Sequence, residues 1–492
     1  MTQETGDRVG LERAAQAAEA DGQFQRAIAA RHALVQANPS DAGARLALAR
    51  ALQNGGELRA SVEAYSAALG AGAPRAEVRL QLGALHHALF EHARAIEHLE
   101  AVIGEEPEHA DALCMLGVVL HDQGRFAEAT LAYERALASQ PAFPQAHFNL
   151  GLSLYETGHV GSAADCFAHC FERNRGASWS ADPGAALERA NALRFEPRDM
   201  AVNRTKVRHD CEQLEYLIGL GRLPAAYRAV LADYRSLLAE VEQIGDDGLL
   251  VPFDEREHPK VAQTYKRPVY LDSGRAPPGP LLNPELDARE IEQRYVDVKP
   301  NVATVDGLLT RPALEALRRF CRESTIWNHL NAGYLGAYFY DGFSSELLLR
   351  LAREFRDRFP RIVRGLPLQM MWAYKCDATL TALGTHADAA AVNVNFWVTE
   401  DEANLDPTAG GLLVYTQDAP REWGFAKFNT DQQSIDRFLE SSSKAPLRVP
   451  YRSNRAVVFD SDLFHASDRP RFREGYLNRR INITLLYGLR AS

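Results

Sequence analysis

The chain has 492 residues, of which 46% are hydrophobic and 24% charged, and its formal net charge is -10. These values are typical of a soluble globular protein with roughly two to four domains, and they exclude a disordered chain or one small module. The acidic balance disfavours nucleic acid as a partner, because phosphate binding relies on clustered Lys and Arg. No apolar stretch approaches the ~18 residues of a membrane span, and the N-terminus lacks the apolar core of a signal peptide. We therefore expect no membrane partner and a cytoplasmic location.

The first third of the chain repeats itself with a period of about 34 residues. The aligned stretches are LGALHHALFEHARAIEHLEAVIGEEP, LGVVLHDQGRFAEATLAYERALASQP and LGLSLYETGHVGSAADCFAHCFERN. Small residues recur in phase where two helices would cross closely, and Pro residues follow the second helices as stops. The recurring residues are Gly83, Gly117 and Gly151, then Ala95, Ala129 and Ala163, with turn glycines at Gly22, Gly56, Gly124 and Gly158. The pattern resembles tetratricopeptide repeats, with about five copies between residues 8 and 177, and it predicts an all-α solenoid.

A solenoid of this kind has a concave groove that holds extended peptides or partner helices. We therefore expect a protein or peptide partner in the groove. The alternative is that the repeats serve only to form a homo-oligomer or to support a neighbouring domain. Some tetratricopeptide-repeat proteins clamp a C-terminal carboxylate with Lys and Asn, but the expected groove positions here hold Leu80, Cys114 and Phe148.

The six cysteines are scattered without a disulfide framework, which favours free thiols in a reducing compartment. Cys166, His169 and Cys170 would share one face of a helix. Three ligands fall short of the four that a structural zinc site needs, and Cys170 aligns with the small packing residue Ala136. Core packing is therefore the favoured interpretation of this group.

The repeats are followed by residues 178–245, which we expect to be capping and linking helices. They contain AALERANALRF and the stretch from Asp210 to Ile244, where apolar residues recur at helical spacing on both sides of Pro224. Residues 246–300 are rich in Pro and poor in periodicity, which predicts a linker or an extended arm.

Residues 301–492 change to helices followed by many short β segments. The predicted strands are NVATVDGLL, PLQMMWAYKC, AVNVNFWVT, GGLLVYT, LRVPYRS, RAVVFDS and NITLLYG, after helices within TRPALEALRRFCREST and SSELLLRLAREFRDRFP. This order predicts an α+β domain built on a double-sheet jelly roll, so the whole chain is multidomain.

His386 and Asp388 stand two residues apart just before one of these strands. The His-x-Asp pattern alone is weak, because His109-Ala-Asp111 repeats it inside the helical array. On an extended segment, residues i and i+2 point to the same side, so an imidazole and a carboxylate would converge on one ion. The alternative to a metal site is that these residues form an ordinary polar loop that leads into the sheet.

His465 follows a strongly β-prone run and offers a third ligand. Two imidazoles and one carboxylate on one face of an octahedron suit Fe(II) and leave three positions open for substrates. Further on, Arg480, Asn482 and Thr484 alternate onto one face of the final strand, where a guanidinium could grip a carboxylate through two parallel hydrogen bonds.

Residues 300–490 thus resemble the Fe(II)- and 2-oxoglutarate-dependent dioxygenases, particularly the prolyl-hydroxylase-like branch. The resemblance implies iron held by His386, Asp388 and His465, with 2-oxoglutarate and O2 as cosubstrates. It also implies that Arg480 binds the distal carboxylate of 2-oxoglutarate, with Thr484 and Tyr374 donating hydroxyl hydrogen bonds beside it.

Some features around this motif leave alternatives open. Arg479 would face the opposite side of the strand, so a shift of one residue would exchange its role with that of Arg480. Asn395 shares a polar strand face with Asn393 and is a candidate for lining the cosubstrate pocket. The loop EDEANLDPTAGG is either a lid over the metal or a solvated connection. The arginines between Arg469 and Arg480 either form a surface of salt bridges or guide an anionic cosubstrate.

Three functions follow from these patterns. The first is a hydroxylase whose protein or peptide substrate is recruited by the repeats. The second is an oxygenase of the same class acting on a small metabolite or natural product, with the repeats used for assembly. The third is a scaffold without turnover, which leaves the metal motif without a purpose.

Overall fold

The computed structural model describes residues 2–176, 200–244, 248–363, 365–378, 380, 384–441 and 444–490. The chain divides into two units, Met1–Cys166 and Phe167–Ser492, and the division falls inside helix α10 (Val160–Arg175). The predicted helix AALERANALRF lies outside the described residues. Among the described helices, none combines the length and the hydropathy that a membrane crossing requires.

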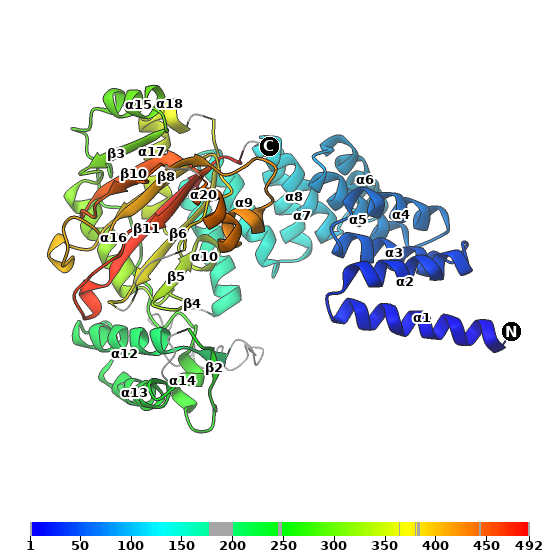
Figure 1. The fold of residues 1–492 in the computed structure, drawn as a ribbon, viewed down its shortest axis with the longest axis horizontal. Helices are drawn as coiled ribbons and strands as arrows, with labels where there is room; N and C mark the ends of the chain where they lie inside the picture. Colours follow the sequence, from blue (N-terminus) through cyan, green and yellow to red (C-terminus); the bar gives the residue numbers. More distant parts are fainter. Residues whose placement is uncertain are drawn as a thin grey trace. The chain divides into compact units, whose positions relative to one another are not determined.

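The first unit consists of helices, and from α1 to α9 each helix packs against the next one (Figure 1). Their bounds are α1 (Thr2–Ala20), α2 (Phe24–Ala37), α3 (Ala42–Asn54), α4 (Leu58–Gly70), α5 (Arg75–Ala88), α6 (His92–Glu105), α7 (Ala110–Asp122), α8 (Phe126–Ser139) and α9 (Pro144–Glu156), followed by α10. The predicted repeats correspond to the pairs α1–α2, α3–α4, α5–α6, α7–α8 and α9–α10. The small residues explain the close pairing, since a Cβ at Gly83 would come within 2.8 Å of the Leu99 side chain.

The turn inside each pair requires a left-handed residue. Positive φ angles recur at Gly22 (68°), Gly56 (79°), Gly124 (73°) and Gly158 (93°), the positions that the sequence repeat singles out. In the third pair the same position is occupied by Phe90, with φ of 59° and a side chain that is 75% exposed. A bulky residue in this conformation is strained, because its Cβ crowds the backbone.

One expected groove residue lies elsewhere. Cys114 is buried in the core between α7, α8 and α9, with 5% of its surface exposed, whereas Leu80 and Phe148 are half-buried. The reason is that Cys114 packs with Tyr133 and Leu150, so its face of α7 points to neighbouring helices. The first-helix positions therefore do not all line a groove.

The second unit begins with helices α12 (Arg204–Gly219) and α13 (Arg228–Glu242), which were expected to cap the repeats. Their apolar faces share a core with Val261, Tyr265 and Val269, and the expected capping role stays a prediction. The segment expected to be a linker is thus partly packed, because these side chains bury their apolar surface against the two helices. It carries β2 (Val251–Pro252), which pairs with β1 (Ala201–Val202), and helices α14 (Pro259–Thr264) and α15 (Ala288–Asp297).

Two antiparallel sheets follow (Figure 1). The larger has seven strands in the order β3 (Val302–Asp306), β10 (Arg455–Asp460), β7 (Val392–Trp397), β12 (Arg480–Tyr487), β6 (Leu368–Cys376), β5 (Tyr334–Tyr338) and β4 (His329–Asn331). The smaller has the order β11 (Leu463–Ser467), β8 (Leu412–Asp418) and β9 (Leu447–Val449). Strands β4, β5 and β11 were not anticipated, and His465 therefore lies within a strand rather than after one.

The two sheets face each other across a shared core. Trp397 and Val457 from the larger sheet pack with Val414 and Leu463 from the smaller one. The outer face of the larger sheet is covered by helices, as shown by the Tyr487 ring, which stacks on Phe355 of α17 (Glu346–Arg358). The inner face is thus the one that can line a site between the sheets.

Candidate metal centre

The structure brings His386, Asp388 and His465 together. The backbones of His386 and His465 exchange hydrogen bonds of 3.0 and 2.8 Å, which join the segment before β7 to strand β11. The Nε2 atoms of His386 and His465 lie 3.8 and 3.5 Å from carboxylate oxygens of Asp388. One ligand atom from each residue lies within 4.8 Å of the other two. Residues from two strand segments therefore offer three donors to one point.

The imidazole nitrogens are oriented for metal binding. Nδ1 of His386 lies 2.9 Å from the carbonyl oxygen of Gly384, and Nδ1 of His465 lies 3.2 Å from that of Leu463. A carbonyl only accepts hydrogen bonds, so each Nδ1 carries the proton and each Nε2 keeps a lone pair for a metal. Burial, together with the neighbouring His386, lowers the pKa of His465 to about 4, so this ring is neutral near pH 7. The donor set fits a divalent ion such as Fe(II).

Asp388 is held by a chain of hydrogen bonds that sequence reasoning did not foresee. The amide of Asn393 donates to Asp388 Oδ2 at 2.5 Å, and the amide of Asn395 donates to Asn393 at 2.8 Å. The Thr484 hydroxyl donates to Asn395 at 3.2 Å, and the Asn482 amide donates to Thr484 at 3.3 Å. Every donor in this chain points toward the carboxylate, an arrangement that polarises successive bonds.

This chain changes the expected roles of two residues. Asn395 uses both its amide group and its carbonyl within the chain, and the Thr484 hydroxyl proton is directed to Asn395. Both were expected to contact the cosubstrate. The signal for the observed arrangement was the alternation of Asn393 and Asn395 on one strand face opposite Thr484.

Arg480 is the first residue of β12, and Arg479 directly precedes the strand. Arg480 is 1% exposed, and it donates to the carbonyl oxygens of Gly410 and Gly411 at 2.9 and 3.2 Å. No Asp or Glu in the described part of the chain forms an ion pair with it. Arg479 instead pairs with Glu212 of α12 at 2.7 Å. A buried cation without a carboxylate fits an anionic ligand, so Arg480 is the better candidate for a cosubstrate carboxylate.

The loop that precedes β8 carries the two glycines that Arg480 contacts. It is tied to the chain around Phe472 by backbone bonds from Leu405 to Arg471 and from Arg473 to Ala403. It supplies no lining residue to the cavity beside the triad. The loop is therefore a fixed connection rather than a lid. The neighbouring Arg469, Arg471 and Arg473 are exposed, unlike Arg479 and Arg480.

Tyr374 lies on β6, opposite Asn482 of β12. Its hydroxyl is 3.2 Å from that of Tyr338, and its ring forms part of a cavity of about 600 Å³ that also reaches His386 and Asp388. Burial and Tyr338 raise the pKa of Tyr374, so it is a neutral hydrogen-bond donor. The expected contact between Tyr374 and a cosubstrate stays a prediction.

Other candidate metal groups are less suitable. His258 lies near Glu240 and Glu257, but its two nitrogens face carboxylate oxygens of Asp233 and Glu240 at 3.2 and 3.1 Å. Carboxylates only accept, so both nitrogens carry protons and no lone pair is left for a metal. Cys166, His169 and Cys170 are not among the metal-compatible groups of the described residues.

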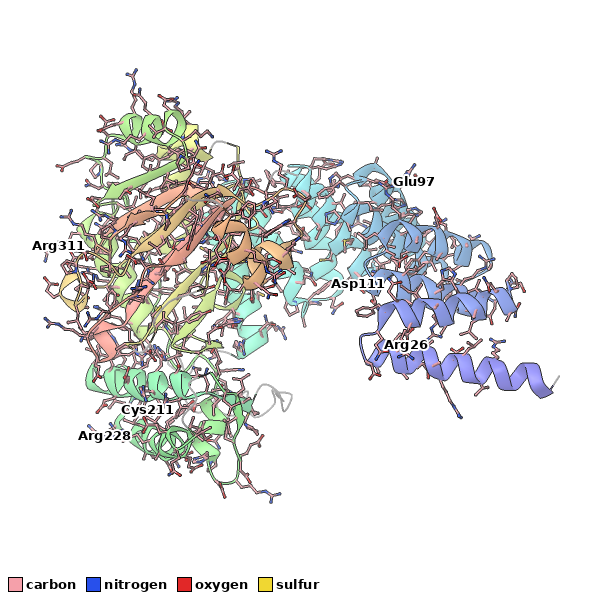
Figure 2. The ribbon with its side chains drawn as sticks, in the orientation of Figure 1. Arg26, Glu97, Asp111, Cys211, Arg228 and Arg311 are labelled. Carbon is pink, nitrogen blue, oxygen red and sulfur yellow. The ribbon has the colours of Figure 1, made fainter. Side chains whose placement is uncertain are left out.

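The second His-x-Asp tripeptide has a structural explanation. His109 is the N-cap of α7, and its Nδ1 accepts a hydrogen bond of 3.3 Å from the Ala112 amide. Asp111, labelled in Figure 2, lies in the first turn of the same helix. The tripeptide therefore starts a helix and does not form part of a metal-compatible group in the described chain.

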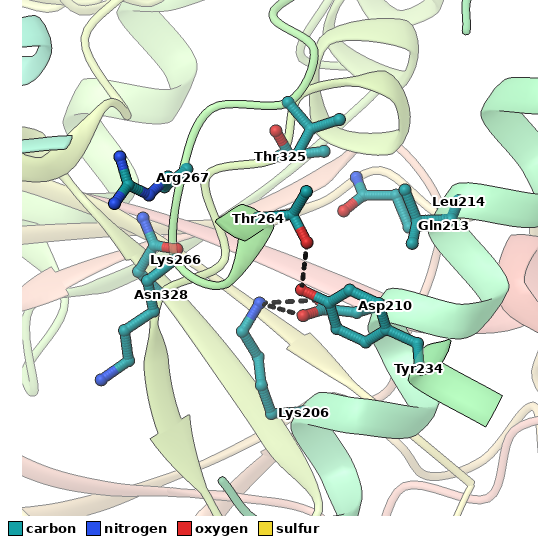
Figure 3. A pocket seen from close by; sticks show the side chains of 11 residues that line it. Lys206, Asp210, Gln213, Leu214, Tyr234, Thr264, Lys266, Arg267, Thr325 and Asn328 are labelled. Atoms are coloured by element: carbon teal, nitrogen blue, oxygen red, sulfur yellow. Dashed lines mark hydrogen bonds and ion pairs between the residues drawn. The ribbon is translucent and has the colours of Figure 1, made fainter. Parts of the chain in front are cut away.

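A separate polar pocket lies beside α12 (Figure 3). Lys206 donates to both carboxylate oxygens of Asp210 at 2.7 Å, and the Thr264 hydroxyl donates to Tyr234 at 3.3 Å. Its volume of about 20 Å³ is sufficient for one or two water molecules. It is therefore too small for an organic substrate.

Comparisons with known proteins concern the N-terminal region. Two family models match, one described as TPR repeat over residues 117–158 and one as tetratricopeptide repeat over residues 80–136. The N-terminal region is a tetratricopeptide-repeat array. Both matches fall within the first unit. No curated protein matches the chain.

Several solved structures are similar to part of the chain. A MamA crystal structure is 24% identical, covers 35% of this chain and 93% of its own, and has a TM-score of 0.32. YrrB, titled a TPR protein with an unusual peptide-binding site, is 18% identical and covers 36% of this chain and 89% of its own, with a TM-score of 0.29. PilF of Pseudomonas aeruginosa is 19% identical and covers 39% of this chain and 86% of its own, with a TM-score of 0.31.

Proposed function

We propose that the second unit is an Fe(II)- and 2-oxoglutarate-dependent dioxygenase that hydroxylates a protein or peptide, and that the tetratricopeptide repeats recruit this substrate. The observation that carries the proposal is the convergence of His386, Asp388 and His465, with both Nε2 atoms free to bind a metal. Two facing antiparallel sheets support the assignment of a double-sheet jelly roll.

When bound, Fe(II) and 2-oxoglutarate would supply the oxidising power for hydroxylation of a C–H bond by O2. The chain itself needs no nucleophile. Its His386, Asp388 and His465 side chains would hold the metal, while Asn393 would keep the Asp388 carboxylate in one orientation. Arg480 would bind the distal carboxylate of the cosubstrate, because its charge has no acidic partner in the described chain.

The cavity beside the triad would exclude bulk water from the reacting atoms. Aromatic rings form much of its wall, with Trp372 buried and Tyr340 and Phe425 exposed at its edge, and the metal ligands His386 and Asp388 lie in its lining. A substrate that fills it would displace water and bring one C–H bond close to the metal, which is the positioning that this chemistry requires.

The test is succinate formation by the purified full chain with Fe(II), 2-oxoglutarate and O2. We expect turnover to fall at least 100-fold in His386→Ala and Asp388→Ala, together with loss of bound metal. The exposed variant Arg471→Gln should retain both properties. A parent protein that binds no divalent metal and forms no succinate would exclude the proposal.

A non-catalytic scaffold is the second candidate, because the tetratricopeptide-repeat array is a binding module in its own right. A same-class oxygenase acting on a small metabolite is the third, since a cavity of about 600 Å³ is large enough for a small molecule. Proteomics separates the protein substrate from the metabolite. It compares cells that carry the parent protein with cells that carry Asp388→Ala. Gain of one oxygen atom on a protein only in the parent cells favours the first proposal, and succinate formation without such a gain favours the metabolite.

A further inference from the structure

The cavity beside the triad has a distinct chemical character. Its aromatic lining residues are Tyr334, Tyr338, Tyr340, Trp372, Tyr374 and Phe425. They come from β5, the residues just after it, β6 and helix α19 (Phe425–Asn429). His386 and Asp388 also line the cavity, whereas Arg480 and Thr484 do not. The cavity is therefore an entrance to the metal ligands, and of the proposed cosubstrate contacts only Tyr374 lies in its described lining.

Three of the rings surround one region. The centroids of Tyr338 and Trp372 are 6.3 Å apart, those of Tyr338 and Tyr374 are 6.3 Å apart, and those of Trp372 and Tyr374 are 6.2 Å apart. Tyr340 stacks on Tyr338 at 5.6 Å and is 42% exposed, so it extends the wall to the surface. The three rings are tilted or edge-on to one another, and Tyr340 is stacked on Tyr338, so a group beside this cluster would meet ring faces and ring edges together.

The charges of the lining favour one class of ligand. Among the described residues, the lining contains no Lys or Arg, and its one carboxylate, that of Asp388, is a proposed metal ligand. An anionic substrate would therefore enter without a counter-charge. The faces of Tyr and Trp rings carry partial negative charge and attract a Lys ammonium or an Arg guanidinium. The acidic net charge of -10 adds a long-range attraction for basic partners.

A second observation indicates a hydrogen-bond acceptor in the ligand. Trp372 is 9% exposed, and its indole Nε1 has no hydrogen-bond partner among the described residues. Buried indole N–H groups usually find an acceptor, because leaving one unpaired costs free energy. The lining also holds the side-chain amides of Gln369, Asn429 and Gln432. A backbone carbonyl of a polypeptide would satisfy the indole, whereas the amides of Asn429 and Gln432 already donate to Ala387 and Asp436.

We propose that this cavity binds a Lys or Arg side chain of a polypeptide, with the cationic group against Tyr338, Tyr340, Trp372 and Tyr374 and a backbone carbonyl on Trp372. The hydroxylation of that basic residue rests on the proposed function. The binding itself does not, because it depends on the aromatic walls and not on a metal.

The test is direct binding of small probes to the full chain. The probes are Nα-acetyl-lysine N-methylamide, its arginine counterpart, and the neutral analogue of the lysine probe in which a methyl group replaces the ammonium. We expect at least one cationic probe to bind about 5- to 30-fold more tightly than the neutral analogue, the range of desolvated cation–π contacts. Equal binding of the neutral analogue, or no binding of any probe, overturns the proposal.

Substitutions in the aromatic wall of the cavity test which residues produce the preference for cationic probes. Tyr340→Leu removes a ring with little loss of packing, since Tyr340 is partly exposed, and it should reduce the cationic preference several-fold. Tyr340→Phe keeps the ring and should keep the preference. Trp372→Phe removes the indole donor and should weaken both lysine-like probes, and it should weaken the cationic probe more because Trp is the best cation–π partner. An unchanged preference in Tyr340→Leu would contradict the assignment of this wall.

Metal binding is measured on the same samples, so the two proposals fail separately. Cationic preference without divalent-metal binding would leave the cavity assignment intact and exclude the oxygenase. Metal binding and succinate formation without cationic preference would leave the oxygenase intact and exclude a basic substrate.

Discussion

The amide of Asn393 donates a hydrogen bond of 2.5 Å to Oδ2 of Asp388, and Asn393 is completely buried. Partners of this kind orient a ligating carboxylate, and their loss costs roughly 10–100-fold in metal affinity. We expect Asn393→Ala to weaken Co(II) binding by about this factor, measured by titration of the visible absorption of the cobalt site. Asn395→Ala is the comparison and should cause a smaller loss, because it removes only the bond to Asn393 and leaves the bond between Asn393 and Asp388 in place. Equal losses in both variants would show a general disturbance of the strand.

Arg480 provides a prediction for the cosubstrate. Replacing it by Gln removes a buried cation with no acidic partner in the described chain, so binding of 2-oxoglutarate should lose roughly 1.5–3 kcal/mol. Arg480→Lys keeps the positive charge but loses the planar guanidinium with its paired donors. Its loss of 2-oxoglutarate binding should therefore lie between those of the parent and Arg480→Gln. The measurement is equilibrium dialysis with 2-oxoglutarate and a divalent metal. The exposed Arg471→Gln should bind like the parent, and an unaffected Arg480→Gln would assign the carboxylate to another residue.

Phe90 occupies the left-handed turn position that glycine holds in the other repeats. The left-handed conformation costs a non-glycine residue about 1–2 kcal/mol, partly offset by the greater freedom of glycine in the unfolded chain. Phe90→Gly should therefore raise the free energy of unfolding of the array by about 0.5–1 kcal/mol, measured by urea denaturation. Gly124→Ala is the converse substitution and should lower the free energy of unfolding. Nothing lies within 4 Å of its added Cβ, so only backbone strain is introduced. A loss of stability in Phe90→Gly would mean that the exposed ring contributes packing.

His258 should make the stability of the fold depend on pH. Burial opposes its charge, but the hydrogen bonds to Glu240 and Asp233 outweigh burial and raise the pKa of the imidazole above its usual value of about 6.5. A raised folded-state pKa stabilises the fold below the unfolded pKa, and this stabilisation is lost as the pH rises through the folded pKa. The melting temperature should therefore fall between about pH 6 and 8 in the parent. His258→Gln should remove most of that slope, and an unchanged slope would contradict the charged imidazole.

The sequence alone determined the features that depend on local spacing. Gly83, Ala95, Gly117 and Ala129 recur at the repeat period, and helix packing requires small residues at such crossings, so the hairpins were predictable from periodicity. The sequence also predicted that His386 and Asp388 direct two donors to one side, because they form an i, i+2 pair before a strand, and the structure brings His465 to the same point.

Only the tertiary structure decided which strands meet and which faces they share. Arg480 lies on the inner face and Arg479 pairs with Glu212, a choice that depends on the pairing register of β12, where a shift of one residue reverses every side chain. The aromatic cavity combines Tyr338 and Trp372 with Phe425, and the helical core takes Tyr265 from a segment that looked like a linker. These contacts join residues that are far apart in the chain, and local propensity carries no information about such pairings. The reason is that apolar surface is buried and hydrogen bonds are completed only when the whole chain is packed.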